Sequence, residues 1–468
     1  MYKKFLVDFL TPVALFGKIQ KCFPHEVKML FESVVHTSDG NFSFIIIGAK
    51  ERLEYKNSKT FYTSLEERKI LDIDPFNFLQ EYYQKIDKKH YQNIVDEVGF
   101  SFVDGFIGYI GYDMVKVFEP TLKESMESLE DALDIPDLDL VRPKLILAYS
   151  HKNSTLTALL NDESFSYALE EIENILISPF ITTKIKPAIL EEKNSFTFDE
   201  DTFKALVDES KEMIRSGDVF QLLLSNRFTQ YGKVDPFSFY RLLRSKNPSP
   251  YLFLIEFEDF SICGSSPEVM VRLIDGEILL RPIAGTRKRG KTLQRDKEME
   301  EELLSDPKEL AEHLMLIDLG RNDVGRVAQS GSVKVVDMMH IERYSHVMHI
   351  VSDVEATIRE DKDMFDLFRA TFTAGTMTGA PKIRAMELIA KYEKVKRSFY
   401  AGSIGYFSFN GNMDSAITIR TALIKEDSIT LQAGGGVVAD SKPELEYLEV
   451  KNKLGALLST LKEMEGMY

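Results

Sequence analysis

The sequence predicts an α+β protein in which mixed or antiparallel sheets pack together and are surrounded by helices. Short β-type runs occur in groups, helical patterns occur in blocks, and two pairs of runs are separated by turn residues as in hairpins. A doubly wound parallel sheet would instead show strands and helices in regular alternation.

The first half of the chain contains strand-like stretches followed by a helical one. FSFIIIGA near residue 45 and FIGYIGYDMV at 106–115 are rich in β-branched and aromatic residues, and residues 145–150 and 154–160 predict a hairpin. Apolar residues recur at helical spacing within 166–176, which predicts a helix.

Residues 177–195 contain two prolines and many polar side chains, which indicates a linker. We therefore place a domain boundary near residue 190 and predict an N-terminal domain of residues 1–190 and a second domain of residues 191–468. A chain of 468 residues is long enough for this division.

The second half begins with a helix, a Gly-Asp turn and a strand through Leu222–Leu224. YLFLIEF and ILLRPIAG predict further strands, and ERYSHVMHIVSDVEA alternates as a half-buried strand does. The segment SIGYFSFNGNMDSAITIRTALI predicts a hairpin that turns at Asn410-Gly411 and carries Arg420 on its second strand. A buried arginine needs a counter-ion, which could be a protein carboxylate or a substrate.

The composition is that of a globular protein with an acidic surface. Lys and Arg number 58 against 74 Asp and Glu, a net charge of −16 that argues against a nucleic-acid partner. Two cysteines are too few for a disulfide framework, no apolar run approaches the length of a membrane helix, and no secretory signal is clear. We therefore expect a cytoplasmic protein without a membrane partner.

Residues 285–292 match the phosphate-loop pattern G-x-x-x-x-G-K-[ST] letter for letter. A phosphate loop needs small interior residues, so that backbone N–H groups can surround the phosphates, and an apolar helix behind it. Here the interior is Arg287, Lys288 and Arg289, and a mostly charged segment follows, as on an exposed helix. We interpret the match as a coincidence and expect no nucleotide there.

Two predicted helices each carry a pair of glutamates three residues apart. The first helix has Asp306 as its expected N-cap, and the second follows an expected capping box of Ser441 and Glu444. If the two glutamate faces meet, they could bind Mg²⁺, which prefers oxygen ligands and leaves positions for substrate. Capping and surface Glu–Lys pairing are the alternatives. The glutamates are Glu309 and Glu312 on the first helix and Glu446 and Glu449 on the second.

Two glycine-containing segments and a histidine are further candidates. Thr376 and Thr378 precede a helix expected to start at Pro381, where free N–H groups could hold a carboxylate. Gly434–Gly436 follow a strand, where the backbone could approach a ligand closely, although both segments could be simple turns. His349 lies in an apolar setting and could be either a core residue or a catalyst.

Together these segments resemble the chorismate-utilising enzymes, most closely the large component of anthranilate synthase. The motifs cover nearly all of residues 200–456 in order, and the first half matches more loosely through MLFESV and GFIGYIGYDMV. The resemblance implies the family's α/β sandwich, with the active site between packed sheets. The motifs are GSSPEVM, PIAGTR, SDPKELAEHLMLIDLGRND, RYSHVMHIVS, AGTMTGAPKIRAMELI, GYFSFNGNMDSAITIR and QAGGGVVADSKPELEYLEVKNK.

The resemblance also implies a reaction and roles for residues. Mg²⁺ holds the ring carboxylate of chorismate, ammonia adds at C2, the 4-hydroxyl leaves, and pyruvate is eliminated to give anthranilate, the first step of tryptophan biosynthesis. Glu312 and Glu449 would bind the metal, with Glu309 and Glu446 behind them. Glu268 would protonate the departing hydroxyl, and His349 would assist the later proton removal. The implied substrate contacts are Ala284, Gly285, Thr286, Thr376, Tyr400, Arg420, Gly434, Gly435, Gly436 and Lys453.

Two positions distinguish reactions within the family. Water-using members carry a lysine base where Gln221 stands, and a neutral amide cannot deprotonate water, whereas ammonia is already nucleophilic. Aminodeoxychorismate synthases carry a lysine that attacks the ring where Ala284 stands. The resemblance therefore favours ammonia as the nucleophile. An aminodeoxychorismate synthase and a catalytically silent, tryptophan-sensing subunit remain the alternatives.

The ammonia requires a source. Neither Cys22 nor Cys263 lies in a Gly-x-Cys-x-Gly elbow, so a separate glutamine amidotransferase subunit is implied. The resemblance also implies feedback inhibition by tryptophan, at a site to which residues 1–190 contribute. Phe31 and Leu252 depart from the usual residues there, which leaves the strength of inhibition open. The matching residues are Glu32, Ser33, Asn247, Pro248, Ser249, Pro250 and Tyr251.

Overall fold

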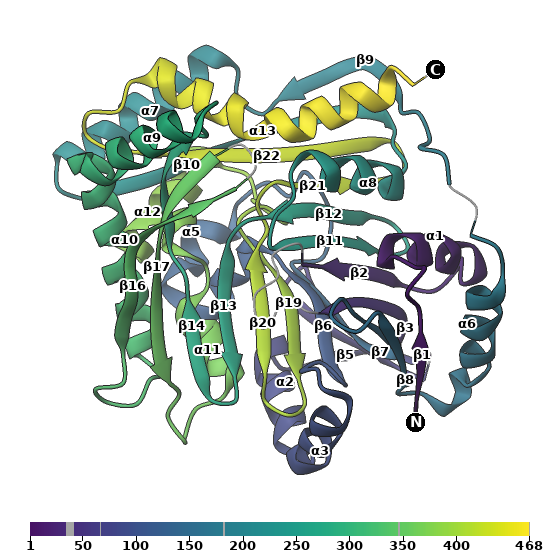
Figure 1. The fold of residues 1–468 in the computed structure, drawn as a ribbon. Helices are drawn as coiled ribbons and strands as arrows, with labels where there is room; N and C mark the ends of the chain where they lie inside the picture. Colours follow the sequence, from purple (N-terminus) through teal and green to yellow (C-terminus); the bar gives the residue numbers. More distant parts are fainter. Residues whose placement is uncertain (34–41, 66, 181–182, 345–346, 468) are drawn as a thin grey trace.

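The structure is a computed structural model that describes residues 1–33, 42–65, 67–180, 183–344 and 347–467. Its strands form two layers that cross each other (Figure 1), and every pairing between named strands in these ranges is antiparallel. The predicted α+β fold with packed antiparallel sheets and surrounding helices is confirmed.

The first layer runs in the order β1-β8-β7-β3-β2-β11-β12-β21-β22-β10-β9. Its strands are β1 (Tyr2–Leu6), β2 (Lys28–Glu32), β3 (Phe42–Lys56), β7 (Leu138–Ser150), β8 (Thr155–Leu160), β9 (Ile189–Phe196), β10 (Gln221–Lys233), β11 (Tyr251–Glu256), β12 (Ser261–Ser266), β21 (Thr421–Ile424) and β22 (Ser428–Val437). Short β18 (Gly379–Ala380) also pairs with β10, and β4 (Lys59–Ser64) and β5 (Glu67–Leu71) extend β3.

The second layer runs in the order β7-β6-β19-β20-β13-β14-β17-β16, with β15 also paired to β17. Residues 138–141 of β7 pair with β6 and residues 145–150 pair with β8, so β7 belongs to both layers. The additional strands are β6 (Gly105–Ile110), β13 (Val269–Ile274), β14 (Glu277–Leu280), β15 (Ile283–Lys288), β16 (Lys334–Arg343), β17 (Val347–Thr357), β19 (Ser403–Ser408) and β20 (Met413–Ile417).

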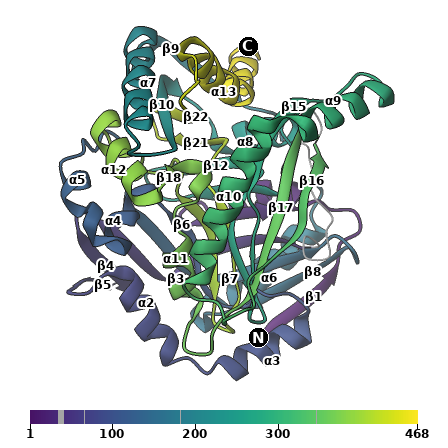
Figure 2. The same cartoon turned by 90° about the vertical axis from the view of Figure 1, so that its left-hand side faces the viewer.

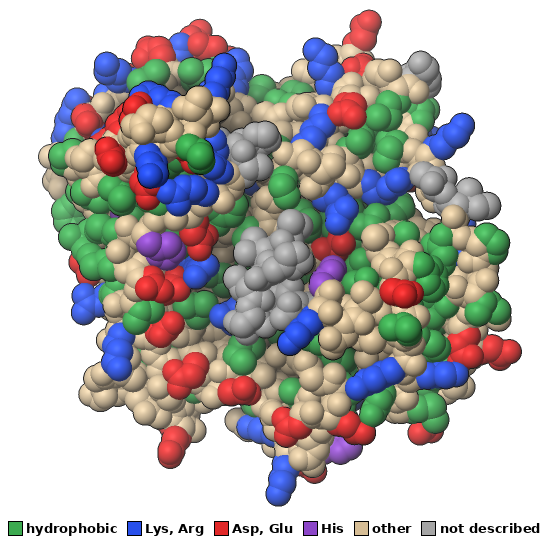
Figure 3. Space-filling view, viewed as in Figure 1, with side chains coloured by type: hydrophobic (Ala, Val, Ile, Leu, Met, Phe, Trp, Pro, Cys, Tyr) green, Lys and Arg blue, Asp and Glu red, His purple; other side chains and the backbone are tan. Residues whose placement is uncertain are grey.

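Helices cover the outer faces of these layers, and α13 lies along β22 (Figures 1 and 2). The α-helices are α1 (Pro12–Cys22), α2 (Pro75–Gln84), α3 (Lys88–Val98), α4 (Val115–Phe118), α5 (Lys123–Glu127), α6 (Tyr167–Ile177), α7 (Glu200–Arg215), α8 (Pro236–Lys246), α9 (Leu293–Ser305), α10 (Pro307–Gly325), α11 (Met364–Thr371), α12 (Lys382–Glu393) and α13 (Pro443–Glu465). No helix in the described ranges is long and apolar enough to cross a membrane. On the face shown in Figure 3, acidic and basic side chains are interspersed.

Two large apolar clusters form most of the core. One includes residues of both sheet layers and of α2 and α11, and the other lies between the first layer and the helices that cover it. Val450, Leu454, Leu457 and Leu461 recur every three or four residues along α13 and are buried. Each such side chain contributes about 1.5–3 kcal/mol when fully buried. This packing fixes α13 and with it the polar residues at its N-terminal end.

Several local predictions need correction. The predicted linker is partly wrong, because Ile189–Phe196 form β9 and pair with β10. The strand expected over 106–115 ends at Ile110, where a 3₁₀ turn follows at Tyr112–Met114. ILLRPIAG forms two strands, β14 and β15, on either side of Pro282. The division at residue 190 stays a prediction, and strands from both sides of it pair with each other, β2 with β11 and β6 with β19.

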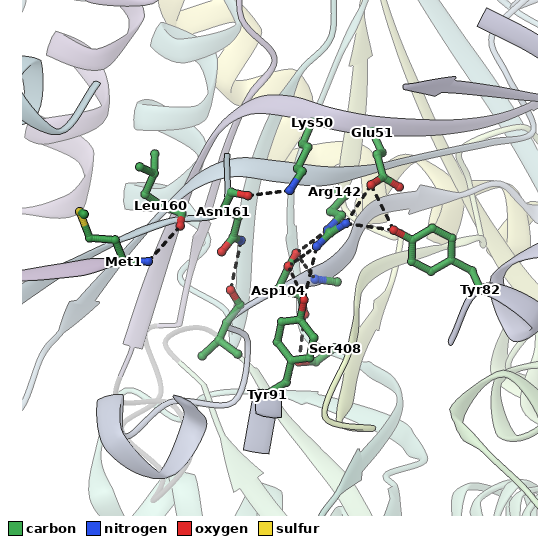
Figure 4. A network of polar contacts seen from close by, with 12 residues as sticks. Met1, Lys50, Glu51, Tyr82, Tyr91, Asp104, Arg142, Leu160, Asn161 and Ser408 are labelled. Carbon is green, nitrogen blue, oxygen red and sulfur yellow. Dashed lines mark hydrogen bonds and ion pairs between the residues drawn. The ribbon is translucent and has the colours of Figure 1, made fainter. Parts of the chain in front are cut away.

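A buried ion network ties β3, β6 and β7 to the helices beside them (Figure 4). The guanidinium of Arg142 lies 2.8 Å from a carboxylate oxygen of Glu51 and 2.7 Å from one of Asp104. It also donates to the Tyr82 hydroxyl at 2.9 Å, and the Tyr91 hydroxyl donates to Asp104 at 3.2 Å. Removing the guanidinium would leave two buried carboxylates without their counter-ion.

We expect Arg142→Met to lower the free energy of unfolding by about 3–5 kcal/mol, because breaking a buried pair costs far more than an exposed one. Chemical denaturation followed by circular dichroism measures this change. Arg359→Met is the matched control, since Arg359 pairs with the exposed carboxylate of Asp361, and its loss should cost less than about 1 kcal/mol. Equal effects of the two variants would contradict the importance of the network.

Candidate active site

The two Glu-x-x-Glu faces meet, as the family resemblance implied. Asp306 accepts hydrogen bonds from the first N–H groups of α10, which fixes the start of the helix that carries Glu309 and Glu312. Burial raises the pKa of Glu312, and the charges of Glu309 and Glu449 raise it further. The carboxylates of the two helices are therefore close enough to repel each other.

A glycine on β22 makes room for the carboxylates of α13. A Cβ atom added at Gly435 would lie 3.1 Å from Glu446 Oε2 and 3.7 Å from Glu449 Oε1. Gly434–Gly436 are part of strand β22, opposite Ser225, Leu224 and Leu223 of β10, and not of a loop after a strand as expected. A larger residue at position 435 would push the two carboxylates away.

Cations and an amide already contact three of the four glutamates. Gln221 Nε2 donates to Glu312 Oε1 at 2.8 Å, and Lys453 Nζ lies 2.6 Å from Glu449 Oε1 and donates to the Gly434 carbonyl at 2.9 Å. Arg287 Nη1 donates to Glu309 Oε1 at 2.9 Å. These contacts bring together α10, α13, β10, β15 and β22.

The fourth glutamate, Glu446, indicates that this carboxylate cluster could bind a cation. Glu446 Oε2 is buried and has no hydrogen-bond partner among the described residues. Burial together with the charge of Glu449 raises the pKa of Glu446, although Ser441 opposes the shift. An orphaned buried oxygen among mutually repelling carboxylates fits a divalent cation. No three Asp, Glu, His or Cys side chains in the described ranges could hold a metal by themselves. Mg²⁺ usually takes only one or two carboxylates, together with substrate oxygens and water.

Glu268 lies between β12 and β13 and is almost completely buried. Its Oε1 accepts a hydrogen bond of 2.8 Å from the Thr376 hydroxyl, on the 3₁₀ turn Gly375–Met377. Burial raises the pKa of Glu268 to about 7, although Thr376, Arg420 and Lys453 oppose the shift. At neutral pH a large fraction of Glu268 therefore carries a proton that it can donate.

Arg420 lies near Tyr400 and is a candidate for binding an anion. Arg420 lies in the bend between β20 and β21 with a φ of 52°, and not on the predicted strand. Its guanidinium makes no hydrogen bond or ion pair within the described part of the chain. Tyr400 is buried, and a Cβ added at Gly434 would lie 3.0 Å from its hydroxyl oxygen. A carboxylate of the substrate would supply the counter-ion that Arg420 lacks.

His349 is held by β15, with Nδ1 3.0 Å from the Gly285 carbonyl and 3.1 Å from Thr286 Oγ1. A carbonyl only accepts, so this hydrogen bond requires the proton on Nδ1 and leaves the lone pair on Nε2. Burial, Arg420 and Lys453 lower the pKa of His349, while Gly285 and Glu342 oppose the shift. His349 is therefore a neutral imidazole that can accept a proton at Nε2.

The PIAGTR stretch is part of this site and not a phosphate loop. Gly285 has a φ of 64°, and a Cβ there would lie 3.1 Å from Glu309 Oε2, so glycine relieves both strain and crowding. Ala284 lies opposite Ile350 in the β15–β17 pairing. Arg289 binds Asp296, whose Oδ1 also accepts from the Gly290 N–H, and Thr292 caps α9. The glycine N–H that a phosphate would need is already occupied.

Most of the residues expected to bind tryptophan lie around Glu32 and the end of α8, whereas the Tyr251 hydroxyl donates to Asp414 of β20 at 2.9 Å. Glu32 accepts hydrogen bonds from the Tyr240 hydroxyl and from Arg244, whose Nε lies 3.1 Å from Glu32 Oε2. Asn247 donates to Ser265 Oγ at 3.2 Å. Pro248, Ser249, Pro250 and Tyr251 lead from α8 into β11, whose Leu252 lies opposite Glu32, and Ser33 follows β2.

Two contacts near the site were not anticipated from the sequence. The hydrogen bond between Gln221 and Glu312 joins residues 91 positions apart. Tyr344 lies against His349, with ring centroids 5.6 Å apart. Tyr344 belongs to the RYSH motif, which could have singled it out, but no role had been assigned to it.

Comparison with known proteins identifies the class. Residues 28–459 match the family described as chorismate binding enzyme, and the chain belongs to this family of enzymes. Among its relatives is the anthranilate synthase component 1 of Aquifex aeolicus, 40% identical over 482 residues, which span 99% of this chain and 95% of that protein.

Solved structures agree with this membership. The crystal structure of anthranilate synthase component I from Streptococcus pneumoniae TIGR4 matches with a TM-score of 0.77 and 32% identity, covering 91% of this chain and 94% of that one. The menaquinone-specific isochorismate synthase of Escherichia coli matches with a TM-score of 0.75 at 18% identity, over 98% and 94% of the two chains, and shows the fold alone. The expected family and its fold are confirmed.

Proposed function

We propose that this chain converts chorismate and ammonia into anthranilate and pyruvate. The observation that carries the proposal is the neutral Gln221 amide on Glu312, at a carboxylate cluster whose Lys453 also acts on Glu268, an acid whose pKa burial raises to about 7. An amide cannot act as a base toward water, so a nucleophile that needs no activation suits this site. Position 284 is alanine and therefore has no amine that could attack the ring. The relatives named anthranilate synthase component 1 also support the proposal.

In the amination step, this chain's residues bind the two carboxylates of chorismate and supply one proton. Arg420, with Tyr400 and Lys453 nearby, binds the pyruvyl carboxylate. The carboxylate cluster that includes Glu312 and Glu449, with its metal ion, would bind the ring carboxylate. Bound Mg²⁺ would supply charge neutralisation and polarisation there. Glu268 gives its proton to the 4-hydroxyl as that group leaves as water while ammonia adds at C2, because hydroxide is a poor leaving group.

In the elimination step, His349 Nε2 takes the C2 proton. The electron pair of that bond enters the ring, the C3–O bond breaks, and pyruvate leaves as its enolate, which is then protonated. The neutral state and the fixed Nδ1 proton of His349 support this role.

Two partners complete the proposal. The relatives are called component 1, which implies a component 2, and we assign to it the supply of ammonia from glutamine. Cys263 is buried in β12 and burial raises its pKa, so it does not resemble a glutaminase nucleophile. Tryptophan would bind at the Glu32–Asn247 cluster, with its amino group facing the Glu32 carboxylate.

One assay tests the proposed reaction. Purified chain, chorismate, Mg²⁺ and an ammonium salt at mildly alkaline pH should give anthranilate fluorescence and an equal amount of pyruvate, without added glutamine. An amino product that keeps its pyruvyl group would favour an aminodeoxychorismate synthase. Absence of any turnover, with tryptophan still bound in calorimetry, would favour a sensing subunit and overturn the proposal.

A further inference from the structure

Tyr344 packs against His349 from the end of β16, the strand that pairs with β17 on the edge opposite to β15. It follows β16, and its backbone is fixed because its N–H donates to the Val347 carbonyl at 2.8 Å while its carbonyl accepts from Arg289 at 2.8 Å. The Tyr344 and His349 rings meet edge to face, at 5.6 Å between centroids and 65° between planes. The imidazole therefore contacts β15 through Nδ1 and also packs against an aromatic ring.

The hydroxyl of Tyr344 is also fixed. It donates to Glu342 Oε2 at 2.8 Å, and Glu342 lies directly opposite His349 in the pairing of β16 and β17. Arg281 holds Glu342 at 2.9 Å and Asp353 at 2.7 Å. Arg281, Glu342 and Tyr344 thus form a supporting chain that ends against the histidine ring.

We propose that Tyr344 is a positioning residue for His349 and that it serves the elimination of pyruvate more than the amination of the ring. The hydrogen bond from Nδ1 to Gly285 fixes one end of the imidazole but allows the ring to tilt about that contact. The Tyr344 ring packed against the imidazole restricts this tilt and so holds Nε2 in one direction. This inference rests on the proposed function, because it concerns the second step of that reaction.

The two steps place different demands on His349. Amination uses the proton of Glu268 and does not require a base at Nε2. Elimination requires Nε2 in line with the C2–H bond, whose electron pair enters the ring as the C3–O bond breaks and the enolate of pyruvate leaves. A tilted imidazole would therefore slow only the second step, and misplacement by about 1 Å can cost about 100-fold in rate.

The test compares Tyr344→Ala, Tyr344→Leu and Tyr344→Phe with the wild-type chain, using chorismate, Mg²⁺ and an ammonium salt. We expect the Ala and Leu variants to consume chorismate at nearly the wild-type rate but to release pyruvate about 10- to 100-fold more slowly. The aminated intermediate that still carries the enolpyruvyl group should accumulate, as resolved by liquid chromatography and mass spectrometry. Tyr344→Phe retains the ring and should keep the two steps coupled.

Each outcome decides the question. If chorismate consumption and pyruvate release fall together in both the Ala and Leu variants, or if neither falls, the inference is overturned. Because the leucine of Tyr344→Leu fills more of the space of the tyrosine ring than alanine does, a folding defect found only in Tyr344→Ala would not obscure the result. Tyr231→Ala, a half-buried tyrosine on β10, is the matched control and should leave both steps unchanged. A wild-type chain that makes no anthranilate would instead refute the proposed function.

Discussion

Glu312→Gln and Glu449→Gln are each expected to lower kcat/KM for chorismate by more than about 100-fold, since even the outer partners of a metal site are worth 10- to 100-fold. The two carboxylates come from different helices and act on the same ligand, so the double variant should lose little more than either single variant. Initial rates of anthranilate fluorescence at several Mg²⁺ concentrations measure both effects.

The same substitutions should leave the fold intact. Burial and neighbouring carboxylates raise the pKa of Glu312, which means that its charge is unfavourable in the folded chain. A neutral amide removes that repulsion, so the melting temperature should stay the same or rise. Glu444→Gln, in the first turn of α13, is the control, because Glu444 is exposed on another face of that helix and should tolerate the change. Near-normal activity in either active-site variant would contradict the assignment.

Glu268→Gln is expected to lower the rate of amination by about 10²- to 10⁴-fold, the usual contribution of a general acid. Glutamine keeps the shape and can still accept from Thr376, but it has no proton to give to the departing hydroxyl. The pH dependence gives a second signature. Burial raises the pKa of Glu268 to about 7 and the protonated form is the active one, so wild-type activity at constant free ammonia should fall as the pH rises through that value.

The residual activity of Glu268→Gln should lack this alkaline decline, because its amide does not titrate. Glu256→Gln is the matched control, since burial also raises the pKa of Glu256, but that side chain contacts Gln20 on the far side of the sheet. A Glu268→Gln chain that keeps both its rate and the wild-type pH profile would show that the proton comes from another group.

Local signals in the sequence predicted that α10 and α13 exist better than they predicted the residues at which these helices begin. Asp306 caps α10 as expected, because an Asp-Pro start is a strong local signal. The Ser441–Glu444 capping box was wrong: α13 begins at Pro443 with Lys442 as its N-cap residue, and Ser441 Oγ accepts from the Val438 N–H at 3.0 Å. The sequence pattern alone cannot decide which of two neighbouring residues, Ser441 or Lys442, is the N-cap of the helix.

Contacts between distant segments could not be predicted from periodicity. The pattern at Gly434–Gly436 suggested a loop, but pairing with β10 holds these residues in a strand. Arg420 lies in a left-handed bend that no local rule assigns to arginine. Helical spacing placed the four glutamates on two faces, but it contains no information about which faces meet across more than a hundred residues. The resemblance to a family supplied that expectation, and the geometry agrees with it.

The central claim is that carboxylates from α10 and α13 share a divalent cation with the ring carboxylate of the substrate. Counting bound Mn²⁺ by electron paramagnetic resonance, with and without chorismate, tests this claim most directly. We predict one Mn²⁺ per chain that binds more tightly when chorismate is present and is lost in the Glu312→Gln, Glu449→Gln double variant. Unchanged binding in the double variant, or the absence of any bound ion in the wild-type chain with chorismate, would contradict it.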